Sequence, residues 1–177
     1  MPLAKVNFFD LRYDQRHRSP VLFLKDSDND KFLPVWIGEL EANSIELAVI
    51  HKNAPRPLTH DLFSSVLRAL DVRVRKVIID RLESRTYFAT LYVLQGEATH
   101  TVDCRPSDAI AIALRENAEI FVDDKLMYNI KFVELDESDA DDADTMAGVE
   151  MAQNIEAPQE DFNEFLRRIS PTDFKEN

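Results

Sequence analysis

The chain has few of the residues on which several common kinds of site depend. Of its 177 residues, three are glycine and one, Cys104, is cysteine. So few glycines leave no glycine-rich loop to hold a phosphate or a dinucleotide, and one cysteine excludes an internal disulfide and a CxxC pair. An HExxH motif is also missing. The commonest nucleotide-binding, zinc and disulfide frameworks are therefore excluded.

Long apolar runs are missing as well. No stretch of 18 apolar residues occurs, and the N-terminal segment MPLAKVNFFDLRYDQ has charges where a signal peptide needs an apolar core. A single cysteine suits a reducing compartment. We therefore expect a cytoplasmic protein without a membrane partner, and its 45% of hydrophobic residues suffices for one sizeable core.

Basic residues are missing from one long segment. Residues 134–161 contain 11 acidic residues and no lysine or arginine. The chain from 134 to 177 has 14 acidic and 3 basic residues, so it carries most of the net charge of −12. Such a segment has too little apolar surface to offset the entropy of ordering it. We expect one domain over 1–133, a disordered acidic linker over 134–157, and an amphipathic helix and tail over 158–177.

The hydrophobic pattern predicts an α+β domain with a mixed β-sheet and packed helices. Strands are predicted at 5–13, 20–26, 31–38, 72–80, 86–94, 98–104 and 119–124, and helices at 39–52, 58–70 and within 105–117. Three strands followed by a helix occur twice, which predicts two βββα halves. Pro34 indicates an edge strand or a bulge, and Gly96 indicates a hairpin turn.

The stretch RPSDAIAIALREN (105–117) has an ambiguous period. Ile110, Ile112 and Leu114 alternate with alanines, as in a strand. The alanines, the Pro-Ser-Asp start and the Arg-Glu-Asn end instead favour a short helix that is apolar nearly all round and therefore buried. We predict the helix. For the helix before it, Thr59 is the predicted N-cap.

A group of polar residues that includes at least one acidic residue stands at the start of each of the three helices. The groups are Glu39 and Glu41 in GELEANS, His60 and Asp61 in THD, and Arg105, Ser107 and Asp108 in RPSD. Helix capping alone explains each group. However, helix starts often converge at one end of a sheet, so these side chains could form one pocket. Phosphodiester cleavage needs such a set: carboxylates for a divalent ion, a base for water and a cation for the phosphate.

On that hypothesis each residue has an expected role. The catalytic set is His60, Asp61, Ser107 and Asp108, with His60 as the general base. Glu41, Asp61 and Asp108 are the expected ligands of a divalent ion such as Mg²⁺, inferred from the carboxylates alone. Arg105 is the expected phosphate-binding cation, because a purely structural design would not choose a cation just before a helix N-terminus.

Apart from Arg105, basic residues are concentrated between residues 68 and 85, a segment with six basic and three acidic residues. Arg73 and Arg75 alternate with valines, so one strand face is expected to be cationic while the other enters the core. Arg73, Arg75 and Lys76 could follow a phosphate backbone, although a solvated strand face is the commoner explanation. Cys104 lies beside Arg105, which could lower its thiol pKa; a small core residue is the favoured interpretation.

One predicted strand has more apolar area than an edge strand usually needs. Its residues Phe32, Val35, Trp36 and Ile37 are close together. We expect part of this area to form a subunit contact in a homodimer or other homo-oligomer.

Four segments together resemble the bifunctional nuclease (BFN) domain family, a bacterial group with plant relatives. They are LPVWIGELEANSIELA, PRPLTHDLFSSVLRAL, VIIDRLESRTYFATL and VDCRPSDAIAIALRENAEIFV, and the resemblance covers roughly 3–133. It implies an α+β domain, a homo-oligomer, and the activity on RNA and DNA known for plant members. The motif positions here are Trp36, Glu41, Pro57, His60, Asp61, Asp80, Arg105, Ser107 and Asp108. Some relatives add a UVR-type module, where this chain has its acidic segment.

The leading functional prediction is a metal-assisted nuclease that hydrolyses single-stranded or non-specific RNA or DNA. The alternative comes from another class. It is a non-catalytic cytoplasmic module that binds protein or nucleic acid, in which the capped helices are purely structural.

Overall fold

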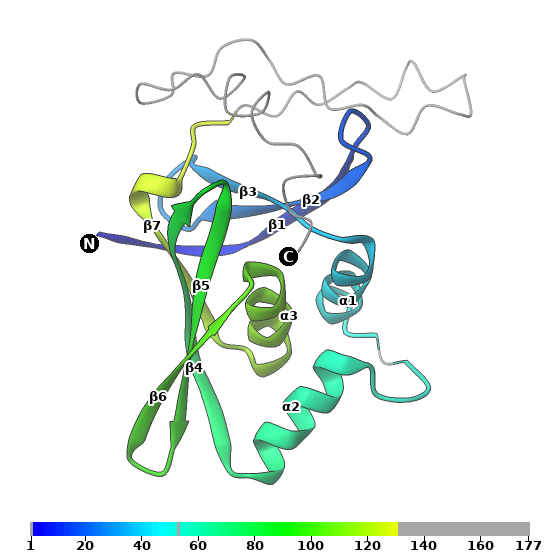
Figure 1. Cartoon of the computed structure of the whole chain (residues 1–177), viewed down its shortest axis with the longest axis vertical. Coiled ribbons are helices and arrows are strands. Elements are labelled where there is room, and N and C mark those ends of the chain that lie inside the picture. The colour runs from blue at the N-terminus through cyan, green and yellow to red at the C-terminus, as the bar shows by residue number, and fades with distance from the viewer. Residues whose placement is uncertain (1, 53, 131–177) are drawn as a thin grey trace.

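The computed structural model of the protein describes residues 2–52 and 54–130, which form one seven-stranded mixed sheet and three α-helices (Figure 1). The sheet order is β3-β2-β1-β7-β4-β5-β6. Its strands are β1 (Leu3–Asp14), β2 (Ser19–Asp26), β3 (Phe32–Trp36), β4 (Val72–Glu83), β5 (Thr86–Gln95), β6 (Ala98–Cys104) and β7 (Glu119–Asp123). The predicted α+β class is confirmed, whereas the segments 134–157 and 158–177 lie outside the described residues.

Two antiparallel three-stranded units make up most of the sheet. The first, β1 to β3, is followed by α1 (Glu39–Val49), and the second, β4 to β6, by α3 (Pro106–Glu116). The helix α2 (Thr59–Ala69) connects the two units. Strand β7 joins them, because it pairs antiparallel with β1 and parallel with β4. The predicted pair of βββα halves is therefore present.

The helix α3 lies at the centre of the core. Its residues Pro106, Ser107 and Ala109–Ala113 are buried. Strands β4, β5 and β7 contact it on one side, and α1 and α2 pack against it. The three alanines have small side chains, which lets α3 approach its neighbours closely. In Figure 1 all three α-helices lie on the same side of β4, β5 and β6. The predicted buried helix over 105–117 is confirmed.

Two predicted helix boundaries are wrong. The N-cap of α2 is Leu58, not Thr59, because the carboxylate of Asp61 accepts the backbone N–H of Leu58 at 2.9 Å and thereby caps the helix from its third residue. The helix α1 ends at Val49 rather than at Lys52. After it, His51 takes a left-handed conformation with φ 51°, which turns the chain out of the helix.

The turn residues lie where the sequence predicts them. β3, which contains Pro34, is an edge strand, and Gly96 has φ 58° in the turn between β5 and β6. Within the apolar β3 segment, however, Phe32, Val35 and Ile37 are buried inside the chain itself. They therefore offer little area to a partner subunit, and homo-oligomer formation stays a prediction. No helix in the described part of the chain has the length and apolar character needed to cross a membrane.

Candidate functional site

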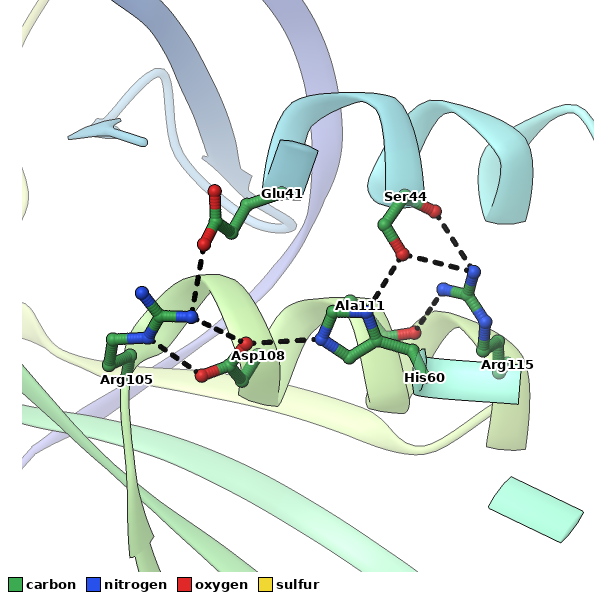
Figure 2. Close-up of polar contacts among 7 residues, drawn as sticks. All are labelled: Glu41, Ser44, His60, Arg105, Asp108, Ala111 and Arg115. Atoms are coloured by element: carbon green, nitrogen blue, oxygen red, sulfur yellow. Dashed lines mark hydrogen bonds and ion pairs between the residues drawn. The ribbon is translucent and has the colours of Figure 1, made fainter. Parts of the chain in front are cut away.

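Side chains from the starts of all three helices meet in one hydrogen-bonded cluster (Figure 2). Glu41 comes from the first turn of α1, His60 from the first turn of α2, and Asp108 from the first turn of α3. Arg105, the N-cap residue of α3, completes the group. The structure therefore brings together four of the residues that the sequence singles out.

Arg105 connects the two carboxylates. Its Nε donates to Asp108 Oδ2 at 2.8 Å, and its Nη2 donates to Asp108 Oδ1 at 3.2 Å and to Glu41 Oε1 at 3.0 Å. The hydrogen bond to Asp108, together with the charge of Glu41, raises the pKa of Arg105 although partial burial opposes this. Its side chain is 58% exposed. Arg105 is thus a fixed cation that still faces solvent.

His60 links Asp108 to α1. Its Nε2 lies 3.1 Å from Asp108 Oδ1, and its Nδ1 lies 2.8 Å from the Ser44 hydroxyl. The hydrogen bond from His60, followed by those from Arg105, lowers the pKa of Asp108 to about 2 despite partial burial. Since an ionised carboxylate only accepts, we assign the ring proton to Nε2, so that Nδ1 accepts from Ser44. The cluster is a directed chain that runs from Ser44 through His60 to Asp108.

Sequence reasoning missed two members of the network, Ser44 and Arg115. Ser44 is 5% exposed, and Arg115 Nη2 donates to both its carbonyl and its hydroxyl oxygen at 3.1 Å. Helical spacing could have identified both. Ser44 follows Glu41 by three residues, and Arg115 follows Asp108 by seven. Each therefore lies on the same helix face as a predicted site residue.

Asp61 lies apart from the cluster around Asp108. Its Oδ1 accepts Arg115 Nε at 2.6 Å, and its Oδ2 accepts the N–H of Leu58. The hydrogen bond from Arg115 lowers the pKa of Asp61, although burial opposes it. Arg115 is two turns of α3 from Asp108, about 10 Å along the axis. Asp61 therefore caps α2 and pairs with Arg115 rather than joining Glu41 and Asp108.

The expected ligand set of Glu41, Asp61 and Asp108 is consequently not assembled. Within residues 2–52 and 54–130, no three His, Cys, Asp or Glu side chains are grouped so that they could hold a metal ion. The guanidinium of Arg105 pairs with both Glu41 and Asp108 and so lies between their carboxylates. In this arrangement the donor groups do not fit a divalent ion.

The remaining predicted residues lie outside the network. Ser107 is buried in α3 with 7% exposure and makes none of the hydrogen bonds of the cluster. Arg73, Arg75 and Lys76 are on β4 and make none of the hydrogen bonds or ion pairs of the cluster. Burial, with the nearby Asp103 and Asp108, raises the pKa of Cys104 to about 11, so the core interpretation of this thiol is favoured over a reactive one.

Replacing Asp61 by alanine should destabilise the fold by about 2 kcal/mol, because the change removes the cap of α2 and the partner of Arg115, whose side chain is only 10% exposed. Urea unfolding measures this loss. Glu46→Ala, an exposed acid on α1, serves as the control and should shift stability by less than about 0.5 kcal/mol. Equal midpoints for the two variants would show that the Asp61 contacts contribute little.

The chain matches a protein-family model and is similar in sequence to several known proteins. The family model described as the bifunctional nuclease domain matches residues 22–134. An uncharacterized protein of Mycobacterium tuberculosis (strain H37Rv) is 35% identical over 173 residues, which are 98% of this chain and 99% of that protein. Bifunctional nuclease 1 of Oryza sativa subsp. japonica is 30% identical over 122 residues, 67% of this chain. Bifunctional nuclease 1 of Arabidopsis thaliana is 30% identical over 114 residues, 62% of this chain. The matches span 37% of the rice protein and 35% of the Arabidopsis protein.

Proposed function

The chain belongs to the bifunctional nuclease domain family, and from this membership we propose that it hydrolyses phosphodiester bonds of RNA, DNA or both with little sequence specificity. The family match contains every residue of the cluster from Glu41 to Arg115. The observation that carries the proposal is Arg105, a half-exposed guanidinium that two carboxylates hold in place. Such a group binds the oxygens of a phosphate through charge-assisted hydrogen bonds.

In this proposal Arg105 binds the scissile phosphate and stabilises the negative charge that develops on it. Asp108 has too low a pKa to take up a proton near neutral pH, so its role is to position Arg105 and His60. When the Ser44 hydroxyl turns away from Nδ1, His60 receives a proton there from the attacking water, whose oxygen bonds to phosphorus as the P–O bond to the leaving sugar oxygen breaks. The ionised Asp108 on the other ring nitrogen stabilises the imidazolium that results. The leaving oxygen then takes up the proton that His60 received.

Metal dependence stays a prediction and enters none of these steps. Glu41 and Asp108 hold Arg105, and Asp61 is paired with Arg115. A divalent ion would need the carboxylates to release the arginine. A chelator tests this directly, since cleavage that survives it is inconsistent with a required Mg²⁺.

The test is degradation of fluorescent single-stranded DNA and RNA by near-stoichiometric protein, with Mg²⁺, with Mn²⁺ and with a chelator. We expect products cut at many positions of both substrates. The Arg105→Ala protein, purified in the same way, is the control for a contaminating nuclease and should cleave the substrates far more slowly than the parent. No cleavage under any of these conditions would contradict the proposal.

One observation favours the alternative, a module that binds without cleaving. The cluster is internally satisfied, because Arg105, Asp108, His60 and Ser44 already bind one another. Such a network also suits a purely structural role for the helix starts. Oligonucleotide binding without cleavage in the same assay would support this second function.

A further inference from the structure

The sheet has an outer face, on the side opposite the three α-helices. Across β4 and β5, Val77 pairs with Leu91 and both are buried beneath the helices, whereas the preceding pair, Lys76 and Tyr92, points the other way. None of the three α-helices lies on this side of β4, β5 and β6 in Figure 1. The outer face includes Arg73, Lys76 and Arg81 of β4, Phe88 and Tyr92 of β5, and Glu119 and Phe121 of β7.

Aromatic rings and cations lie next to one another on the outer face. Lys76 Nζ is 4.9 Å from the ring centroid of Tyr92 and 5.9 Å from that of Phe121. The guanidinium carbon of Arg81 is 4.3 Å from the ring centroid of Phe88. All three rings are half-buried, so each still presents some of its surface to solvent.

The charges on this side are not all neutralised. Arg81 pairs with Asp80 and Glu83. In contrast, Arg73, Arg75 and Lys76 form no ion pair with any residue in 2–52 or 54–130, although the carboxylate of Glu119, which pairs with Lys5, lies near Arg75 and Lys76. Arg75 is the extra residue of a β-bulge between Val74 and Lys76, which leaves its side chain exposed beside the others.

We propose that the outer face binds single-stranded nucleic acid, with bases stacked on Tyr92, Phe121 and the Phe88–Arg81 pair. Arg73, Arg75 and Lys76 contact the phosphates. Aromatic rings on a sheet accept unpaired bases whatever their sequence, whereas the bases of a duplex are already stacked on one another. The inference rests on the proposed function and adds a preference for single strands.

The charge on the outer face favours this occupant over a second copy of the chain. The centre of a protein–protein interface is depleted of charged residues, and here every ring has a cation beside it. The face is also on the other side of the sheet from α3 and Arg105. It would therefore hold a strand away from the scissile phosphate and affect affinity rather than turnover.

Fluorescence anisotropy measures binding with three probes of equal length: oligo(dT), an abasic strand and a duplex. All three have phosphorothioate linkages to resist hydrolysis, and a gel run after each reading checks that they are intact. We expect the parent to bind oligo(dT) more tightly than the other two. Tyr92→Leu should weaken oligo(dT) binding roughly 5- to 150-fold and leave abasic binding within about twofold of the parent. Tyr92→Trp should retain affinity because it keeps an aromatic face. Tyr13→Leu, at an exposed tyrosine of β1, is the control and should bind like the parent.

Lys76→Gln tests the phosphate contacts separately. It should weaken binding of oligo(dT) and of the abasic strand alike, and lower the slope of log affinity against log salt by roughly 0.7. Thermal melting of each variant checks that it is folded. Parental oligo(dT) affinity in both folded variants would overturn the inference. So would sedimentation in which Tyr92→Leu dissociates an oligomer but binds oligo(dT) normally, since that assigns the face to a second copy.

The two proposals fail in different ways. If the parent cleaves single strands and Tyr92→Leu binds oligo(dT) as the parent does, the inference about the outer face is wrong and the nuclease proposal stands. If the parent binds oligo(dT) through Tyr92 but never cleaves it, the nuclease proposal is wrong and the outer face is supported.

Discussion

Asp108→Asn should lower the rate of oligonucleotide cleavage roughly 100- to 1,000-fold while the protein stays folded. Asparagine has nearly the same shape, but it lacks the charge that holds the Arg105 fork through two hydrogen bonds and fixes the His60 ring. Both the phosphate-binding cation and the base lose their position. Single-turnover cleavage and thermal melting, measured on the same preparation, check this result.

The control for this variant is Asp71→Asn. Asp71 is exposed in a turn with φ 54°, a conformation that asparagine adopts readily, so the substitution should change neither folding nor cleavage. Cleavage by the Asp108→Asn protein at the parental rate would place the active site elsewhere and leave the cluster with a structural role.

The stability of Asp108→Asn should depend less on pH in acid than the stability of the parent does. The pKa of Asp108 is about 2 in the folded protein, below its ordinary value of 3.8. Ionised Asp108 therefore stabilises the fold above about pH 4, and this contribution, on the order of 2 kcal/mol, is lost as the pH falls from about 4 to 2. Unfolding free energies of the parent should fall more steeply across this window than those of Asp108→Asn.

The second large effect concerns Arg105. Arg105→Ala should lower cleavage at low substrate concentration roughly 100- to 1,000-fold, because the group that contacts the phosphate is gone. The side chain is 58% exposed, so the melting temperature should fall only slightly. Titration of a hydrolysis-resistant phosphorothioate oligonucleotide measures affinity, and steady-state rates on the ordinary oligonucleotide measure turnover.

Two further substitutions separate charge from geometry at this position. Arg105→Lys keeps the charge but cannot bind Asp108 and Glu41 together through a planar guanidinium. We therefore expect it to cleave faster than Arg105→Ala but more slowly than the parent. Arg68→Ala, at an exposed arginine near the end of α2, should behave like the parent. A fully active Arg105→Ala protein would contradict the role assigned to Arg105.

Local sequence signals predicted the parts of the site that depend on local chemistry. Proline, serine and an acid before a run of small apolar residues specify a capped, buried helix, and α3 is one. An arginine just before a helix start is unfavourable to the helix dipole, which marked Arg105 as a residue with another purpose. In the structure its two carboxylate partners offset that cost.

Tertiary packing decided what the sequence left open. Asp61 and Asp108 both follow helix starts. The packing of α2 on α3 determines that Asp61 bonds to Arg115 and that His60 bonds to Asp108. Likewise, strand alternation predicted that Arg75 shares a face with Arg73. A bulge at Arg75 changes the register there, so that Lys76 pairs with Tyr92 and also lies on the outer face. The local spacing of residues predicts neither outcome.

The position of β7 also determines when the fold can be completed during synthesis. β1 leaves the ribosome long before β7, yet the two are neighbours in the sheet and pair Leu3 with Asp123. The first unit, from β1 to α1, can pair its own strands early but waits with one side of β1 unpaired until nearly the whole domain has been made. Such an open strand edge invites pairing with other chains. Translation speed and chaperone access over residues 40–120 should therefore matter more for the yield of this protein than for one whose neighbouring strands are consecutive in the chain.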